Sequence, residues 1–69
     1  MGISYKKLWK LLIDKNLKKK FLIEEVGLSR STLTHMNREE HVNTESLMKI
    51  CVALNCDIGD IVSFEQRSN

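Results

Sequence analysis

Apolar residues recur along most of the chain at intervals of three and four, the spacing of one face of an α-helix. The first such face consists of Tyr5, Leu8, Trp9, Leu12 and Ile13. Ser4 precedes it, and a serine hydroxyl can cap the start of a helix. We expect this helix to end near Asn16, because asparagine tolerates the left-handed conformation that often closes helices.

Two short helices are predicted next, over about residues 18–26 and 30–36. Gly27 lies between them, where a glycine past the end of a helix turns the chain. Ser29 then offers its hydroxyl as the cap of the third helix. Residues 37–43 are polar and predict a loop.

Asn43 can cap a fourth helix, and Asp57 can cap a last turn or two. The inward face of the fourth helix is expected to comprise Leu47, Ile50, Cys51 and Leu54. The last turn is expected to bury Ile58, Ile61 and Val62. The predicted fold class is therefore all-α, with five short helices around one core. The chain is expected to be a single domain over residues 1–69, with its core at about residues 4–64.

The size of the chain limits what it can do. Its 69 residues suffice for one compact domain with a small core, which leaves little room for a catalytic cleft. Adjacent carboxylates such as Glu24 and Glu25 diverge on a helix, and three glycines form no phosphate-binding loop. We predict that the protein is not an enzyme and binds neither a cofactor nor a small-molecule ligand.

Membrane and metal sites are not expected either. No stretch approaches the ~18 consecutive apolar residues of a membrane span, and the lysine-rich N-terminus does not resemble a signal peptide. The expected compartment is the cytoplasm. Cys51 and Cys56, taken with His35 and His41, lack the spacing of a zinc site. Buried structural cysteines are the expected alternative.

Charge is distributed unevenly along the sequence. Residues 1–20 contain seven lysines and one aspartate, whereas residues 21–69 contain four Lys or Arg and eight Asp or Glu. The N-terminal part could meet a polyanion. A solvated helix face is the other interpretation of such a lysine run.

Residues 18–36 carry the most informative pattern. Two short helices separated by Gly-Leu-Ser must cross at a large angle, as in a helix-turn-helix. Apolar residues lie five and one before Gly27 and one, six and nine after it: Leu22, Val26, Leu28, Leu33 and Met36. This pattern resembles the helix-turn-helix of the Cro-type phage repressors and the Xre regulators. The segment KICVALNCDIGDI (49–61) is similar to that of a subgroup of very small Xre-type regulators, so the resemblance covers about residues 4–64.

The resemblance implies a bacterial or phage DNA-binding transcriptional regulator, with repression as its expected role, whose third helix enters the major groove of double-stranded DNA. It implies base contacts from Arg30, Ser31, Thr34 and His35, and phosphate contacts from Lys19, Lys20, Ser29, Asn37 and Arg38. Arg30 is the first candidate, because its guanidinium can bond guanine O6 and N7 together.

Two departures from the family pattern stand out. Ile23 occupies a position where the family usually has a small residue at the helix crossing. Glu39 and Glu40 replace the expected glycine or basic residue after the third helix, and carboxylates near DNA repel phosphate. These departures keep a second interpretation open, an antitoxin-like or adaptor module that binds protein rather than specific DNA.

A single recognition helix contacts only a few base pairs, so we expect a homodimer on a two-fold operator. Candidate interface residues are Met48 and Val52 on the fourth helix, and Val62 and Phe64 beyond the last turn. Alternatively, these residues complete a small core around Trp9.

Overall fold

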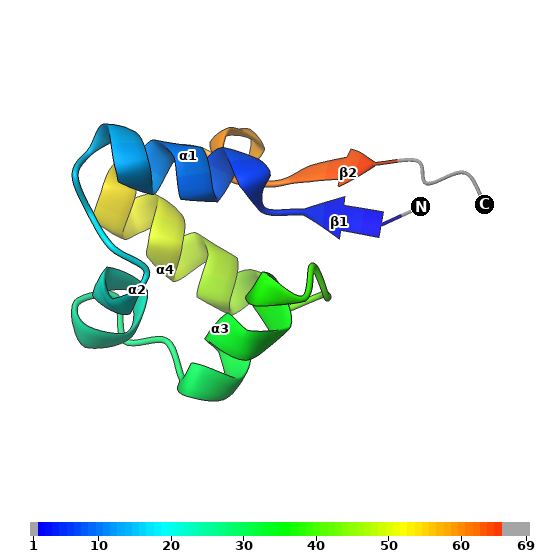
Figure 1. Ribbon diagram of the computed structural model, residues 1–69, viewed down its shortest axis with the longest axis horizontal. Coiled ribbons are helices and arrows are strands. Elements are labelled where there is room, and N and C mark those ends of the chain that lie inside the picture. The colour runs from blue at the N-terminus through cyan, green and yellow to red at the C-terminus, as the bar shows by residue number, and fades with distance from the viewer. Residues whose placement is uncertain (1, 66–69) are drawn as a thin grey trace.

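Helices dominate the computed structural model, which describes residues 2–65. Its elements, in chain order, are β1 (Gly2–Ser4), α1 (Lys6–Asp14), α2 (Lys20–Glu24), α3 (Arg30–Asn37), α4 (Thr44–Leu54), the 3₁₀ helix η1 (Ile58–Asp60) and β2 (Ser63–Glu65) (Figure 1). The compact, mostly helical architecture is as expected. The fifth α-helix was wrong: a single 3₁₀ turn and a short strand take its place.

The two ends of the described chain form a small antiparallel sheet, which the all-α prediction missed. Ile3 of β1 pairs with Phe64 of β2, and Ser4 pairs with Ser63. This pairing keeps Ser4 extended, so α1 begins only at Lys6, with Tyr5 as its N-cap residue. The Ser4 hydroxyl still accepts a hydrogen bond from the Lys6 backbone N–H at 3.3 Å. Ser4 was therefore wrongly predicted as the cap of this helix: the N-cap position is Tyr5, which makes no side-chain cap bond.

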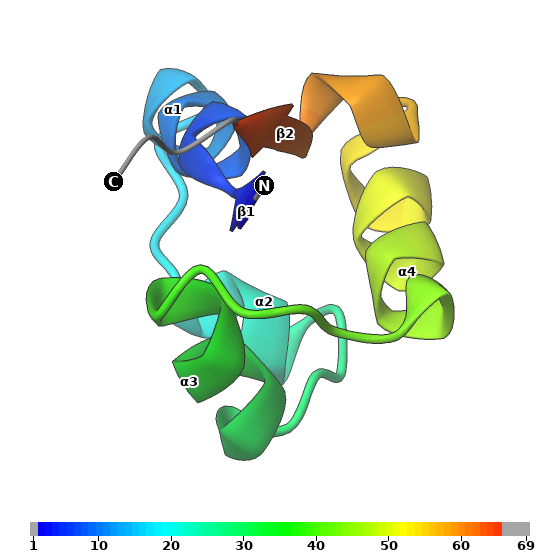
Figure 2. The same cartoon turned by 90° about the vertical axis from the view of Figure 1, so that its right-hand side faces the viewer.

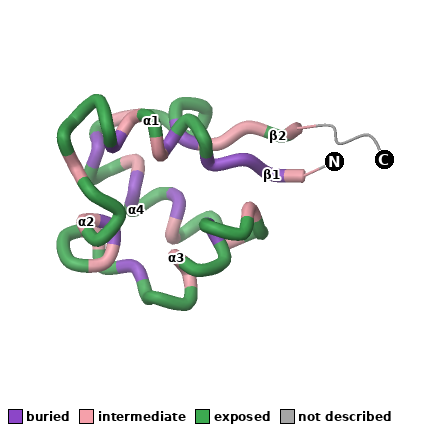
Figure 3. Tube along the Cα trace, in the orientation of Figure 1, coloured by how far each residue is buried: buried purple, intermediate pink, exposed green. Residues whose placement is uncertain are grey.

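The core draws buried residues from β1 and from all four α-helices (Figure 3). On α1, Tyr5, Leu8 and Leu12 are buried as predicted, and Trp9 is half-buried. Ile13 was wrongly placed in this face, since 73% of it is exposed. A helix rotates about 100° per residue, which carries Ile13 past Trp9 and off the stripe that Leu8 and Leu12 define.

Side-chain caps begin α3, α4 and η1, as the sequence predicts. The Ser29 hydroxyl accepts from the backbone N–H of Thr32 at 3.1 Å, and the Asn43 carboxamide accepts from that of Ser46 at 2.8 Å. Asp57 caps η1 in a reciprocal arrangement with Asp60.

The inward faces of α4 and η1 match the prediction less completely. Leu47, Ile50 and Leu54 are buried and Cys51 is half-buried. After η1, Ile61 is buried and Val62 is half-buried, but Ile58 was wrongly predicted to face inward and is 45% exposed. The cause is the 3₁₀ geometry of η1, which turns the chain more tightly than the α-helix assumed.

Helices α1, α3 and α4 end with the same backbone motif. In each, a left-handed residue follows the helix, and the next residue donates its N–H to the carbonyl five positions earlier. This Schellman-type ending brings the side chains of those two positions together. The pairs are Leu12 with Leu17, His35 with Glu40, and Cys51 with Cys56.

Candidate nucleic-acid interface

Helices α2 and α3 form a helix-turn-helix unit. Both lie on the side of the molecule away from α1 in both views (Figure 2). Helix α2 is shorter than predicted, but Leu22 is fully buried and Gly27 adopts the expected positive φ of 89°. Leu28 and Met36 are buried as well. The apolar pattern around Gly27 thus holds the two helices against the rest of the domain.

Helix α3 presents the predicted base-contacting side chains to solvent. Met36 is buried and Leu33 half-buried, which fixes the inward face of α3. The positions on the other faces are all exposed, namely Arg30, Ser31, Thr34, His35, Asn37 and Arg38. The structure therefore gathers these residues on one accessible helix.

Two of these side chains already make bonds within the domain. The Thr34 hydroxyl donates its proton to the Arg30 carbonyl at 2.9 Å. Thr34 can therefore contact a base only through its methyl group or by accepting a hydrogen bond at its oxygen. His35 Nδ1 lies 2.6 Å from Glu40 Oε1. A base contact by His35 would therefore fall to Nε2.

Lys19 links three parts of the fold. Its Nζ donates to Asn37 Oδ1 at 2.7 Å and lies 4.3 Å from the centroid of the Trp9 ring. The structure thus brings together two predicted phosphate-contacting residues, Lys19 and Asn37. Sequence reasoning placed Trp9 only in the core and missed this cation–π contact. The only sequence signal for this contact was that Trp9 stands ten positions before Lys19, at the start of α2.

The remaining predicted phosphate contacts are exposed. Lys20 Nζ lies 3.9 Å from Glu24 Oε2 in an exposed i,i+4 pair, which stabilises little and leaves the ammonium accessible. Ser29 and Arg38 flank α3, at its cap and just past its end. Lys20, Ser29 and Arg38 are all exposed.

Glu40 contributes to the fold. Its carboxylate meets His35, and its backbone carbonyl accepts a hydrogen bond from the Tyr5 hydroxyl at 2.6 Å. Burial raises the pKa of Tyr5, and a hydrogen bond with the Val42 backbone partly offsets this shift. Glu40 thus joins the end of α3 to the start of α1 through its backbone, while its carboxylate contacts His35 on α3.

The other residues that depart from the family pattern, Ile23 and Glu39, also fit the fold. Ile23 is half-buried, and α2 still packs against α3. Glu39 is the left-handed residue that ends α3, with φ of 57°. Its position is the one where a glycine would be expected.

Comparison with known proteins shows which family this chain belongs to. A model of the Cro/C1-type helix-turn-helix DNA-binding domain matches residues 7–67. The chain belongs to this family. A crystal structure of the transcriptional regulator VanUg (Form II) is similar to this Cro/C1-type domain, with a TM-score of 0.87 and 50% sequence identity. The match covers 90% of this chain and 83% of that one. A search among curated proteins finds no match.

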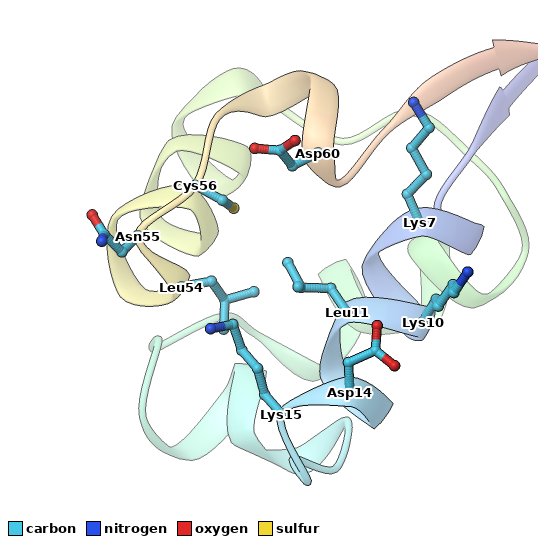
Figure 4. A pocket seen from close by; sticks show the side chains of 9 residues that line it. All are labelled: Lys7, Lys10, Leu11, Asp14, Lys15, Leu54, Asn55, Cys56 and Asp60. Carbon is cyan, nitrogen blue, oxygen red and sulfur yellow. The ribbon is translucent and has the colours of Figure 1, made fainter.

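The pockets described on this Cro/C1-type domain lie away from α3. One pocket of about 370 Å³ lies between α1 and the end of α4, and none of its lining residues comes from α2 or α3 (Figure 4). Lys7 at its rim donates to the Gly59 carbonyl at 3.1 Å. Within residues 2–65, no three His, Cys, Asp or Glu residues group as metal ligands, and no helix is long and apolar enough to cross a membrane.

Proposed function

We propose that this Cro/C1-type domain is a sequence-specific transcriptional regulator that inserts α3 into the major groove of double-stranded DNA. The observation that carries the proposal is the division of α3 into a face held by Met36 and Leu33 and an exposed polar face beginning at Arg30. Such a helix can enter the groove without disturbing the core. The likeness to VanUg, a transcriptional regulator, supports the same role.

Base recognition is assigned to the exposed side chains of α3. Arg30 lies in the first turn, where recognition helices approach base edges, and its guanidinium can pair with O6 and N7 of guanine. The Thr34 methyl group can contact the methyl group of thymine. Ser31 and His35 Nε2 supply hydrogen bonds of lower selectivity.

Phosphate contacts are assigned to residues that frame α3 on both sides: Lys19, Lys20, Ser29, Asn37 and Arg38. Such contacts fix the register of the protein on DNA and carry no sequence information directly. Each phosphate neutralised steepens the dependence of log affinity on log salt by about 0.9. The bond from Lys19 to Asn37 holds an ammonium and an amide at one point, which pre-orders them for a single phosphate.

The proposal includes a homodimer that acts as a repressor. Two copies on a two-fold operator would place their α3 helices one helical turn of DNA apart, about 34 Å. A compact domain bound across a promoter would exclude other proteins from it.

Selection of binding sites from a randomised duplex pool at moderate salt tests this function. We expect enrichment of a dyad-symmetric site with half-sites one turn apart. Enrichment of no sequence, with only weak and salt-sensitive binding, would contradict the proposal. That outcome would favour a protein-binding module, for which the carboxylates of Glu39 and Glu40 beside α3 are the supporting observation.

A further inference from the structure

The end of α4 brings two cysteines together, away from the helix-turn-helix. Asn55 is left-handed, with φ of 53°, and the Cys56 N–H donates to the Cys51 carbonyl at 3.0 Å. The Asn55 N–H donates to the Val52 carbonyl at 3.3 Å, which completes the Schellman motif. In this motif the side chains at the positions of Cys51 and Cys56 usually make an apolar contact. Here both positions are free cysteines.

A third sulfur borders the same opening. A pocket of about 590 Å³ on the outer side of α4 is lined by Met48, Cys51, Val52, Asn55, Cys56 and Asp57. Met48 precedes Cys51 by three residues on α4, which places the two on neighbouring positions of one helix face. Both cysteines are half-buried, so the thiols are sheltered and still reachable from solvent.

The charges around the thiols favour a cation. Asp57 follows Cys56 directly and lines the same pocket, and Asp60 lies three residues further along the chain. Figure 4 shows Asp60 on η1, facing the end of α4 that carries Cys56. The same carboxylates attract a positive ion that can displace the thiol protons.

We propose that Cys51 and Cys56 form a binding site for a soft monovalent metal ion such as copper(I), with the Met48 thioether as a weaker third donor. Thiolate and thioether ligands select soft ions of this kind. On binding, each thiol releases its proton and each sulfur forms one bond to the ion, so no oxidant or reductant is required. Zinc prefers four N, S or O ligands, and residues 2–65 contain no group of three His, Cys, Asp or Glu that could hold a metal.

The site is independent of the DNA-binding surface, because all of its ligands come from α4 and the turn after it. Base recognition by α3 could therefore fail without affecting the metal site. The two proposals share only the surface around Met48 and Val52, which is also a candidate dimer surface.

Copper(I) affinity of the reduced full chain, measured without oxygen against a chromophoric copper(I) chelator, tests the site. We expect one ion per chain. Cys51→Ser and Cys56→Ser should each lower the affinity by more than about 100-fold, the upper end of what losing an outer-shell partner costs at metal sites. Met48→Leu should lower it by a smaller factor. Met36→Leu, a conservative change at a fully buried methionine of α3, is the matched control and should leave it unchanged. Equal affinity of the wild type and Cys51→Ser would overturn the proposal.

A second measurement needs no variant. Native mass spectrometry with silver(I), followed by alkylation with iodoacetamide, should show one silver ion per chain and both thiols protected together. Protection of one thiol alone, or alkylation of both at the rate seen without silver, would overturn the shared site. A chain isolated with a Cys51–Cys56 disulfide that persists in reductant would do so as well.

Discussion

Single residues set where the helices of this domain stop. Asn16, Glu39 and Asn55 all adopt positive φ, a conformation that costs most L-residues ~1–2 kcal/mol. Asparagine is tolerated there because its short polar side chain can hydrogen-bond locally. The sequence indicated Asn16 through this preference. It indicated Ser29 and Asn43 as caps because their side-chain oxygens can accept a backbone N–H at the start of a helix. It gave no comparable signal for Glu39, because glutamate has no such preference.

Replacement of Asn16 isolates this effect. Asn16→Ala should lower the free energy of unfolding by about 1 kcal/mol, because alanine has no polar side chain to offset the cost of the left-handed conformation. Asn16→Gly is the matched control and should be neutral or stabilising, since glycine adopts this conformation readily. In a domain of this size, 1 kcal/mol corresponds to a decrease in Tm of roughly 4–8 °C. Thermal unfolding followed by circular dichroism measures the change, and equal Tm values for the two variants would contradict the assignment.

At the scale of elements, α3 is held by a local cap at its start and by contacts from distant parts of the chain at its end. Ser29 caps its start, while the Lys19–Asn37 bond and the Tyr5–Glu40 bond tie its last turns to the rest of the fold. Helical spacing predicted which residues of α3 are exposed, because burial of one face determines the other. Spacing alone could not predict the ties, since each joins residues 18 or more positions apart.

Two substitutions separate the roles assigned to α3 and to the residues before α2. Arg30→Ala should lose about 1–3 kcal/mol on the selected site and relax its preference at one base position. Lys19→Ala should weaken specific and random DNA alike and reduce the salt slope by about 1, or slightly less. Fluorescence anisotropy titrations on both duplexes, at several salt concentrations, measure the two quantities.

Lys19→Ala also removes the contacts to Asn37 and Trp9, so its fold must be compared with the wild type. Lys20→Ala controls for this loss of fold contacts: it removes another proposed phosphate contact, and its exposed ion pair with Glu24 contributes little to stability. If Arg30→Ala and Lys19→Ala reduced binding to both duplexes in the same proportion, the division into base and phosphate contacts would be wrong.

At the scale of the whole molecule, the pairing of β1 with β2 closes the domain around its core. Each strand has three residues, too few to show a period-two pattern, and the partners are about 60 positions apart in the sequence. Local sequence reasoning therefore had no means of finding the sheet. Hydrophobic spacing places Ile3 only as a local contact of Leu8 at the start of α1, whereas the structure pairs its strand with β2 and buries Ile3 in the core.

The same substitution at two isoleucines measures what this closure contributes. Ile3→Ala should destabilise the domain by about 2–5 kcal/mol, the range for truncating a buried isoleucine. Ile13→Ala, on the 73%-exposed position of α1, should change the free energy of unfolding by no more than ~0.5 kcal/mol. Urea unfolding of the two variants provides both values. Since a chain of this length has only ~3–10 kcal/mol in total, similar midpoints for both would show that the sheet lies outside the cooperative core.

The last prediction concerns assembly. The proposed dimer rests on the few base pairs that one α3 can contact, and the domain offers two exposed apolar surfaces for a second copy. Met48 and Val52 lie one turn apart on α4, 60% and 76% exposed, and Phe64 on β2 is 69% exposed. We expect sedimentation at DNA-binding concentrations to show a dimer, and either Val52→Asp or Phe64→Asp to dissociate it.

The variant that becomes a monomer identifies the interface, because a charge buried without a partner strongly disfavours association. The other variant then serves as its matched control. The dissociating variant should also lose affinity for an operator with two half-sites while binding a single half-site as the wild type does. A wild type that sediments as a monomer, and remains one on the two-fold operator, would contradict the dimer, and specificity would then have to come from the contacts of one α3 alone.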